Sequence, residues 1–264
     1  MTIVTLTTDW GRSNHYTGSV KGTLYRLIPG VQVVDISHEV ACYDIMQTFF
    51  ILKQAYPNFP EGSIHLIGVN SEASIETPHL AIKHHGHYFV GADNGVFSLL
   101  FDNKPEYAYE IELHQDSDYF TFSTRDVFAK TAAYLASGKA IKSLGKVREN
   151  LNHKIPFEPV IYQDRIVGKV MFVDDYENVF VNINKELFRK VGRNRSFVIS
   201  FRSPGNSIRQ IHESYSDVVA GERMAVFGSS GYLEIAINQG KASSLLGLHI
   251  NDTVSIDFMS APSS

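Results

Sequence analysis

The hydrophobic pattern of this chain changes once, near the middle of the sequence. Up to about residue 140, short β-branched runs alternate with stretches of helical spacing, and beyond about residue 160 the runs are short, β-type and separated by turn residues. Alternating strands and helices favour a mostly parallel sheet flanked by helices, whereas a series of short strands favours a small β-barrel or sandwich. We therefore predict an α/β amino-terminal domain, residues 1–157 with a linker, and an all-β, barrel-like carboxy-terminal domain, residues 158–264.

The elements of the first half have recognisable ends. Pro29-Gly30 closes one helical stretch and Pro57 follows another. Two short strands that flank His84-His85-Gly86-His87 predict a hairpin. The predicted strands are Ile3–Thr8, Val31–Ile36, Ser63–Val69, Leu80–Ile82 and Tyr88–Val90, and the predicted helices are Tyr16–Ile28, Asp44–Tyr56 and Asp126–Ser137.

A polar and basic segment joins the two halves. It runs from about residue 140 to residue 160 and contains Pro156 and Pro159, a composition typical of a linker between domains. The predicted strands that follow it are Ile161–Val173, Val179–Ile183, Ser196–Phe201, Arg223–Phe227, Leu233–Ile237 and Val254–Phe258.

The composition disfavours several classes of protein. The net charge of the 264 residues is −4, so no phosphate-seeking surface is expected and nucleic acid is not a predicted partner. The first residues lack a basic segment before an apolar one, and no apolar run approaches the ~20 residues that a bilayer requires, so we expect neither a signal peptide nor a membrane partner. Cys42 is the only cysteine, which fits a reducing compartment, and we expect a cytoplasmic protein.

Polar side chains follow three predicted strands of the first half. Asp9, Asn70 and the segment Asp35–His38 lie at the carboxyl ends of these strands, where open α/β sheets bind their ligands. A carboxylate at the end of the first strand suits a ribose diol, because it can accept two hydrogen bonds at once. The alternative is that Asp9 caps the turn that follows it, and the pattern alone favours neither.

Several familiar site motifs are missing. No Gly-x-Gly-x-x-Gly follows Asp9-Trp10-Gly11, and there is no Walker A segment, so dinucleotide binding and phosphate cradling have no support. His84, His85 and His87 surround a glycine without a nearby carboxylate or cysteine, so we predict a solvated turn and no metal site. Taken alone, Asp174–Asn178 and Gly228–Gly231 are typical of polar turns between strands.

Ordered motifs along nearly the whole chain resemble one known family. They are Thr8-Asp9-Trp10-Gly11, Val34-Asp35-Ile36-Ser37-His38-Glu39-Val40, Tyr43-Asp44-Ile45, Gly91-Ala92-Asp93-Asn94-Gly95-Val96, Arg125-Asp126-Val127-Phe128-Ala129, Val173-Asp174 with Asn178, and the run from Gly228-Ser229-Ser230-Gly231 to Asn238-Gln239-Gly240. The family is that of the S-adenosylmethionine hydroxide adenosyltransferases, which are related to the S-adenosylmethionine-dependent fluorinases and chlorinases. The resemblance implies an α/β domain, a β-barrel domain, and homotrimers that bind S-adenosylmethionine or adenosine between the first domain of one subunit and the second domain of its neighbour.

The resemblance also implies which residues hold that ligand. In the first half, Asp9 is expected to take the ribose hydroxyls, Asn14 stands where the family usually has an acidic residue, and Tyr43 matches an aromatic position against the ligand. Aromatic rings suit adenine and the sulfonium cation. In the second half, the matching residues are Asp174, Tyr176 and Asn178 for the amino-acid and adenosyl parts, Tyr215 for adenine stacking, and Ser229 and Ser230 near the methionine carboxylate.

The catalytic positions depart from the family. The resemblance places an aspartate, an arginine and a histidine of the hydrolases at Asn70, Thr77 and Ser123, and none of these three residues is a base near neutral pH. The halogenases carry tyrosines at Asn70 and Ser123, and their serine or glycine beside the halide corresponds to Thr124. A substitute base is expected in or beside the altered loop, at Glu72, Glu76 or His79.

These observations predict an adenosyltransferase that displaces methionine from the ribose 5′ carbon of S-adenosylmethionine. Water or hydroxide is the expected nucleophile, and adenosine and methionine are the expected products. The substituted positions leave two alternatives, a binding protein for adenosine or S-adenosylmethionine with impaired catalysis, and a transferase that uses a halide or another anion. No cofactor or metal is predicted, since S-adenosylmethionine is the substrate itself.

Overall fold

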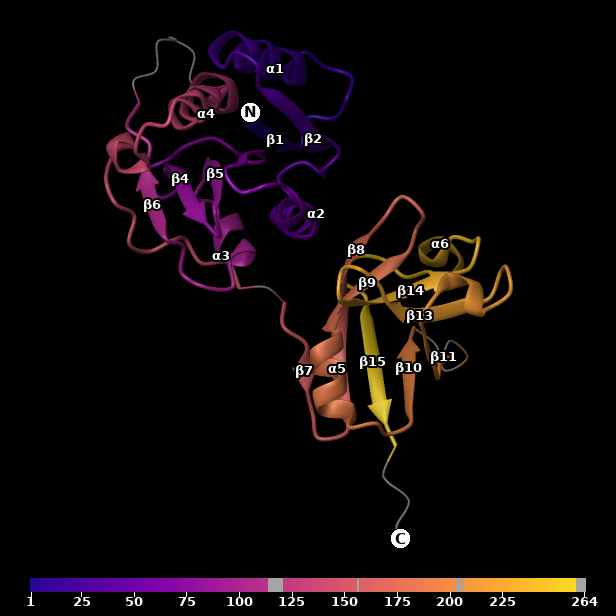
Figure 1. Ribbon diagram of the computed structural model, residues 1–264. Helices are drawn as coiled ribbons and strands as arrows, with labels where there is room; N and C mark the ends of the chain where they lie inside the picture. Colours follow the sequence, from indigo (N-terminus) through magenta and orange to yellow (C-terminus); the bar gives the residue numbers. More distant parts are fainter. Residues whose placement is uncertain (114–120, 156, 203–204, 206, 260–264) are drawn as a thin grey trace. The chain divides into compact units, whose positions relative to one another are not determined.

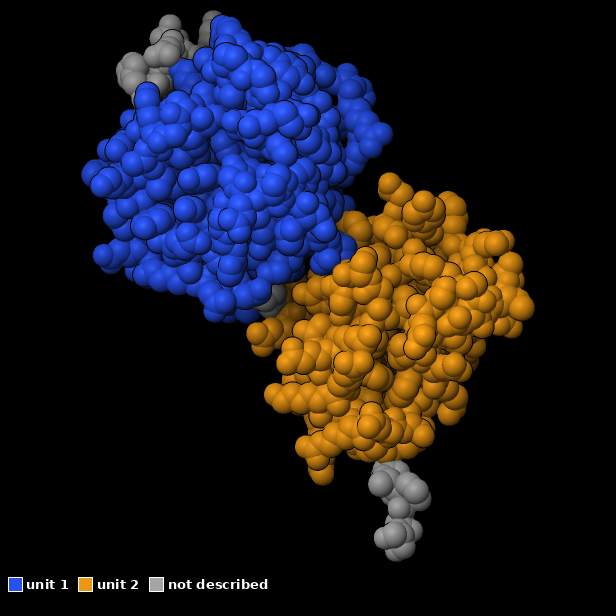
Figure 2. All heavy atoms as spheres, viewed as in Figure 1, with its two compact units in different colours: residues 1–155 blue, residues 156–264 orange. Residues whose placement is uncertain are grey.

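The chain forms two compact units, residues 1–155 (unit 1) and 156–264 (unit 2), coloured blue and orange in Figure 2. The structure is a computed structural model that describes residues 1–113, 121–155, 157–202, 205 and 207–259. Each unit has a hydrophobic core of its own. Among the described residues, no helix has the length and apolar character needed to cross a bilayer.

Unit 1 is built on a six-stranded sheet with the strand order β2-β1-β3-β5-β4-β6 (Figure 1). Strand β1 pairs in parallel with β2 and β3, β3 pairs in parallel with β5, and β4 runs antiparallel to both β5 and β6. The predicted mostly parallel sheet is therefore confirmed, and the carboxyl ends of β1, β2 and β3 lie at one edge. The strands are β1 Ile3–Thr8, β2 Gln32–Ser37, β3 Ile64–Gly68, β4 His79–His84, β5 His87–Ala92 and β6 Tyr107–Glu110.

Helices cover both faces of this sheet because successive strand residues point to opposite sides. Val4, Leu6 and Leu66 share a core with Val20 and Leu24 of α1, and α4 packs into the same core. Helix α2 begins at Asp44, whose side chain accepts a hydrogen bond from the Gln47 amide at 2.9 Å. The helical segments are α1 Tyr16–Leu27, α2 Ile45–Ala55, η1 Tyr56–Asn58, α3 Val96–Leu100, the π-helical turn η2 Thr124–Phe128, α4 Ala129–Ala136 and η3 Ile141–Leu144.

The predicted hairpin around residues 84–87 is confirmed, but the prediction that its histidines are solvated is wrong for two of them. His85 and Gly86 form the turn with φ of 47° and 76°, and His85 is exposed. His84 and His87 are only 4% and 6% exposed, because β4 and β5 lie inside the sheet and aromatic rings of Phe101 and Tyr56 pack against them.

A row of polar side chains crosses the core beside this hairpin. The Thr5 hydroxyl lies 2.8 Å from Nδ1 of His65, and Nε2 of His65 lies 3.1 Å from Nδ1 of His87. Over the described part of the chain, no group of three or more histidine, cysteine, aspartate or glutamate side chains is arranged to hold a metal ion.

Unit 2 is a curled, half-barrel sheet with the strand order β11-β10-β15-β8-β9-β14-β13-β12, to which β7 adds by pairing with β8. This agrees with the predicted barrel-like fold class. The strands are β7 Val160–Ile161, β8 Arg165–Val173, β9 Val179–Asn184, β10 Phe197–Phe201, β11 Ser207–Ile208, β12 Ile211–His212, β13 Arg223–Phe227, β14 Tyr232–Ile237 and β15 Thr253–Phe258.

Unit 2 also contains two short helices that we did not predict, α5 Lys185–Gly192 and α6 Ala242–Leu246. Helix α5 begins at Asn184, whose side chain accepts a hydrogen bond from the Leu187 amide at 2.7 Å. Leu187, Phe188 and Val191 then pack against the core of the unit. The cap residue and the apolar spacing were visible in the sequence, and together they are typical of a helix.

The buried histidines predict how unit 1 loses stability in acid. Burial, and after it the neighbouring His87, lowers the pKa of His65 from 6.5 to about 3. The unfolded chain therefore binds a proton near pH 6.5 that the folded chain does not bind until about pH 3, and the free energy of unfolding falls as the pH drops between these values. We expect a loss of roughly 2–3 kcal/mol from His65 between pH 6.5 and pH 4.5, measured by urea denaturation.

Two variants isolate this contribution. His65→Gln removes the titrating group, so the corresponding part of the pH dependence should disappear. His153→Gln changes an exposed histidine of the same unit and should leave the slope of stability against pH nearly as it is in the wild type. An unaltered slope in the His65 variant would contradict the prediction.

Candidate functional site

Asp9 lies directly after β1, at the carboxyl edge of the sheet of unit 1. Its Oδ2 atom accepts a hydrogen bond from the Tyr43 amide at 3.0 Å. Its Oδ1 atom accepts no hydrogen bond from any residue that the structure describes. The backbone of Tyr43 is left-handed, with φ of 65°, and its ring is 72% exposed. Asp9 therefore fixes the turn at Tyr43 through one oxygen, and its other oxygen has no hydrogen-bond partner among the described residues.

His38 holds the turn that carries Asp9. Its Nδ1 lies 2.7 Å from the Thr8 hydroxyl, its backbone carbonyl accepts from the Gly11 amide at 2.7 Å, and its ring lies nearly parallel to that of Trp10. Asp35 faces the other ring nitrogen at 3.1 Å. Partial burial acts to raise the pKa of Asp35, but the hydrogen bond from Lys21 and the nearby His38 lower it overall. The Asp35–His38 motif is thus structural support for Asp9.

Asn14 has a local role in the structure. Its side-chain amide donates to the Trp10 carbonyl, and its Oδ1 accepts from the Tyr16 amide at 3.1 Å, at the start of α1. Asn14 is exposed beside the Asp9 turn. Both ends of its side chain are bonded within the turn, so its contribution to a ligand site stays a prediction.

Asn70 follows β3 at the same edge of the sheet and has a left-handed backbone with φ of 44°. The Asn94 side-chain amide donates to the carbonyls of Val69 and Asn70, at 3.1 and 3.0 Å. Asparagine tolerates this conformation better than most residues do. The turn 92–95 therefore fixes the backbone of Asn70, and the side chain is exposed.

The altered loop, residues 71–77, is closed by its own side chains. The Ser74 hydroxyl accepts from the amides of Glu76 and Thr77, at 3.2 and 3.0 Å, and lies 2.8 Å from the Thr77 hydroxyl. Thr77, a predicted catalytic position, thus uses its hydroxyl inside the loop. Glu72 and Glu76 are exposed.

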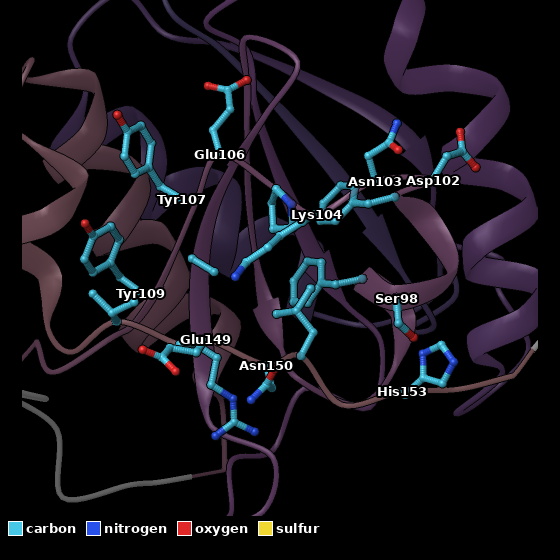
Figure 3. A pocket seen from close by; sticks show the side chains of 17 residues that line it. Ser98, Asp102, Asn103, Lys104, Glu106, Tyr107, Tyr109, Glu149, Asn150 and His153 are labelled. Atoms are coloured by element: carbon cyan, nitrogen blue, oxygen red, sulfur yellow. The ribbon is translucent and has the colours of Figure 1, made fainter.

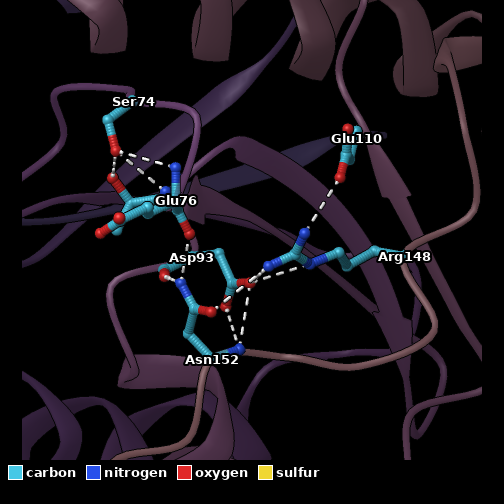
Figure 4. Close-up of polar contacts among 7 residues, drawn as sticks. Ser74, Glu76, Asp93, Glu110, Arg148 and Asn152 are labelled. Atoms are coloured by element: carbon cyan, nitrogen blue, oxygen red, sulfur yellow. Dashed lines mark hydrogen bonds and ion pairs between the residues drawn. The ribbon is translucent and has the colours of Figure 1, made fainter.

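An ionic group around one buried carboxylate, the Asp93 cluster of Asp93, Arg148, Asn152 and Glu110, holds the far end of this loop (Figure 4). Asp93 is fully buried and accepts from the Asn152 amide at 3.0 Å and from the Arg148 guanidinium at 3.2 Å. Arg148 also contacts Glu110 at 3.2 Å. The Asn152 side chain donates at 2.6 Å both to the Asp93 carbonyl and to the Glu76 carbonyl. Burial raises the pKa of Asp93, against the hydrogen bonds from Asn152 and Arg148.

Ser123 and Thr124 lie at the start of the π-helical turn η2, a feature that occurs frequently at functional sites. Both are buried, at 7% and 0% exposed. The Thr124 hydroxyl donates to the Ser71 hydroxyl at 3.5 Å, the outer limit of a hydrogen bond. Gly68 is needed here, because a Cβ at this position would come within 3.0 Å of Thr124 and 2.9 Å of Trp10. The structure therefore brings Thr124 beneath the Asn70–Ser71 corner.

His79, a candidate base, lies behind the same corner. Its Nε2 is 2.9 Å from the Ser71 carbonyl, and its ring packs edge-on against Phe128. A carbonyl can only accept, so Nε2 carries the hydrogen and Nδ1 keeps its lone pair. Burial lowers the pKa of His79, opposed by the bond to Ser71, so the ring is neutral near neutral pH.

Unit 2 has a cavity of about 600 Å³ that gathers four of the predicted ligand residues. Those four are Asp174, Tyr176, Asn178 and Tyr215, and the sequence analysis missed the others, which are Asp175, Ile237, Asn238, Gln239, Gly240 and Lys241. The run Asn238-Gln239-Gly240 was part of a motif, but no residue in it was singled out. Their position in that motif was the one sequence signal that could have identified them as cavity residues.

The turn from Asp174 to Asn178 is rigid. Asn178 donates to both carboxylate oxygens of Asp174, from its amide at 2.8 Å and from its side chain at 3.2 Å. Glu177 lies between them with φ of 62° and accepts from the Ser244 amide and from Lys241, each at 2.9 Å. These bonds, Ser244 first, lower the pKa of Glu177 to about 2. Glu177 thus fastens the Asp174 turn to the start of α6.

Tyr215 enters the cavity from the turn η4 Tyr215–Asp217, and its hydroxyl donates to Glu234 at 2.5 Å. Ser229 and Ser230 do not line this cavity. They form the turn between β13 and β14, where the Ser230 hydroxyl accepts from the Tyr232 amide at 3.2 Å. Their role near a carboxylate stays a prediction.

A second cavity, of about 820 Å³, lies in unit 1 between residues 101–109 and 147–153 (Figure 3). Tyr107 and Tyr109 stand on one side of it, and Ser98 and His153 on the other. It contains none of the predicted site residues, so its size alone does not make it the functional site.

Two features are therefore available for a small polar ligand, a carboxylate with one unbonded oxygen at the strand ends of the α/β unit and a cavity with acidic and aromatic lining in the half-barrel unit. The model of the SAM hydroxide adenosyltransferase N-terminal domain matches residues 4–145, and that of the C-terminal domain matches residues 168–255. The chain belongs to this family.

Relatives of known name or structure cover most of the chain. An (R)-S-adenosyl-L-methionine hydrolase of Thermus thermophilus is 30% identical over 91% of this chain and 93% of its own length. A fluorinase of Nocardia brasiliensis is 22% identical over 89% of this chain and 90% of its own. The crystal structure of an uncharacterized conserved protein from Thermotoga maritima is 30% identical, with a TM-score of 0.87 over 97% of this chain and 99% of that one.

The Asp93 cluster predicts that two neighbouring cationic side chains contribute very different amounts to the free energy of unfolding. Arg148→Ala leaves the fully buried Asp93 without its cation and should lower the free energy of unfolding by about 3–5 kcal/mol. Lys146→Ala is the control, because Lys146 and its partner Glu112 are 80% and 52% exposed, and it should cost less than about 1 kcal/mol. Chemical denaturation of both variants tests this, and equal losses would show that the cluster contributes little.

Proposed function

We propose that this protein cleaves S-adenosylmethionine with water or hydroxide and releases adenosine and methionine. A bond forms between the nucleophile's oxygen and the ribose 5′ carbon while the bond from that carbon to sulfur breaks. The electron pair of the broken bond stays on sulfur and neutralises the sulfonium, so methionine is a good leaving group. The protein must align the nucleophile behind the carbon, on the side opposite the sulfur, and strip the nucleophile of its hydration shell.

The observation that carries this proposal is the half-bonded carboxylate of Asp9. One oxygen is fixed by the Tyr43 amide and the other is left to accept from a ribose hydroxyl. The cavity of unit 2 supplies complementary groups, because Asp174 suits an ammonium and the ring of Tyr215 suits adenine. Membership of the family and the name of the Thermus relative support the same substrate.

The nucleophile's proton needs an acceptor that Asn70, Thr77 and Ser123 do not supply. Thr77 is bonded within its loop and Ser123 is buried. Of the three candidate bases, His79 is the best supported, since it is neutral and is bonded to the corner formed by Asn70 and Ser71. We propose that the lone pair on Nδ1 of His79 receives the proton, directly or through water.

The same substitutions support a second candidate, a binding protein with little catalysis. It rests on the ligand-side residues being in place while the hydrolase triad is absent. Transfer to a halide has no feature of its own in the described residues that favours it. The trimer with sites shared between subunits, the absence of a cofactor and a cytoplasmic location stay predictions.

Turnover and binding by an Asp9 variant test the proposed function. Wild-type protein should convert S-adenosylmethionine to adenosine and methionine. Chromatography of the products measures this, in reactions with and without halide. Asp9→Asn should weaken the binding of adenosine and S-adenosylmethionine alike by about 10- to 150-fold, because a charge-assisted hydrogen bond contributes roughly 1.5–3 kcal/mol. Glu39→Gln is the control, since its carboxylate is exposed and, among the described residues, pairs with exposed Arg12. Calorimetry that finds neither ligand bound to the wild type would refute the proposal.

The base is tested by removing each candidate in turn. His79→Ala should lower the rate constant roughly 10²–10⁴-fold with little change in the affinity for S-adenosylmethionine, since a positioned general base acts on the chemical step. The rate of the wild type should fall with acid as His79 becomes protonated, at a pH below 6.5 because its pKa is lowered. Glu72→Gln and Glu76→Gln should have small effects. Brisk hydrolysis in all three variants would place the base elsewhere.

A further inference from the structure

Glu234 is a buried carboxylate to which the proposed reaction assigns no role. It lies in the middle of β14, between Leu233 and Ile235 of the core of unit 2, and it is 3% exposed. In the register of the sheet it faces Val226 of β13 and Phe180 of β9. An apolar residue would suit this position better, because a carboxylate is rarely buried unless it is paired.

Glu234 has no cation to compensate it among the residues that the structure describes. Burial raises its pKa, the hydrogen bond from Tyr215 opposes this, and the nearby Asp174 adds to the rise. Among the described residues, its hydrogen-bond donor is the Tyr215 hydroxyl, at 2.5 Å from Oε1. The cost of burying Glu234 is therefore not offset by a salt bridge among the described residues, so its place in the strand needs another explanation.

Tyr215 is the part of the cavity wall that Glu234 holds. The backbone of Tyr215 is fixed at the other end by a capping box, in which the Ser214 hydroxyl and the Asp217 carboxylate each accept from backbone amides. The ring lines the cavity beside Asp174 and Asn178 and is 44% exposed. With the backbone capped and the hydroxyl bonded, both ends of the side chain are fixed before any ligand binds.

Glu234 also lies close to a second loop. A Cβ at Gly228 would lie 3.1 Å from its Oε2, which is tighter than most Cβ contacts, so glycine suits the turn that carries Ser229 and Ser230. One buried side chain thus bonds to Tyr215 and lies close to the 228–231 turn.

We infer that Glu234 is a positioning residue, which holds the ring of Tyr215 against the cavity so that it is ready to stack on the adenine of the ligand. This rests on the proposed function, because it takes an adenosyl group as the occupant. A ring that is fixed in advance loses less conformational entropy on binding than a free one. The smaller entropy loss increases the affinity for the adenosyl end of the ligand.

Three variants and two ligands test the inference. Tyr215→Phe and Glu234→Ala each free the ring, so each should weaken adenosine binding roughly 3- to 10-fold. Both should raise KM for S-adenosylmethionine and leave kcat nearly unchanged, since a ring that binds substrate and transition state equally does not alter the chemical step. The double variant should be no worse than either single one. Glu234→Gln keeps the acceptor oxygen and should restore wild-type binding.

Two control variants change exposed residues of unit 2 that do not line the cavity. Glu222→Ala removes an exposed carboxylate from unit 2, and Tyr162→Phe alters an exposed tyrosine outside the cavity; both should bind adenosine as the wild type does. Thermal melts establish that each variant is folded, and Tyr215→Phe with Glu234→Gln carries the test if Glu234→Ala does not fold. Unchanged adenosine affinity in Tyr215→Phe, or a loss in Glu234→Gln equal to that in Tyr215→Phe, overturns the inference while wild-type cleavage leaves the proposed function intact. A wild type that binds neither ligand overturns both.

Discussion

The pairing of Asp93 with Arg148 and Asn152 is the interaction on which the first half of the site depends. A fully buried carboxylate must be compensated, and here the compensating groups come from the chain that leaves the unit. Asn152 also donates a hydrogen bond to the carbonyl of Glu76 and so fixes the altered loop. Asn94, one residue after Asp93, fixes the loop's other end at Asn70. One buried charge therefore sets the edge of the sheet at which a ligand is expected.

Polar side chains support three of the loops of this protein. His38 beneath the Asp9 turn, Glu177 beneath the Asp174 turn and Glu234 behind Tyr215 each bond a loop from below. The carboxylates and rings that we propose as ligand-binding groups are thus supported by a second set of polar groups behind them. This arrangement limits the freedom of the site before binding, which is what positioning a small nucleophile requires.

The sequence predicted the elements whose signals are local, and missed those that depend on neighbours in space. Five of the six strands and three helices of the first half follow from periodicity and from Pro29, Gly30 and Pro57, whereas β6 and α3 were not predicted. Periodicity cannot tell that β4 and β5 lie inside a sheet, so the burial of His84 and His87 was missed. Asp9 was placed at a strand end by pattern, but its bond to Tyr43 joins residues 34 positions apart in the chain. Glu234 lay in an apolar run and had no local signal of its partner.

The left-handed backbone of Asn70 bears on how such a site can change during evolution. Asparagine and aspartate are the two side chains besides glycine that adopt this conformation with least strain. They also have nearly the same shape, so exchanging one for the other leaves the loop, its bond to Asn94 and the path of β3 as they are. A corner held in this way allows a lineage to gain or lose an ionisable group in a single step. The scaffold can therefore outlast one chemistry and be available for another.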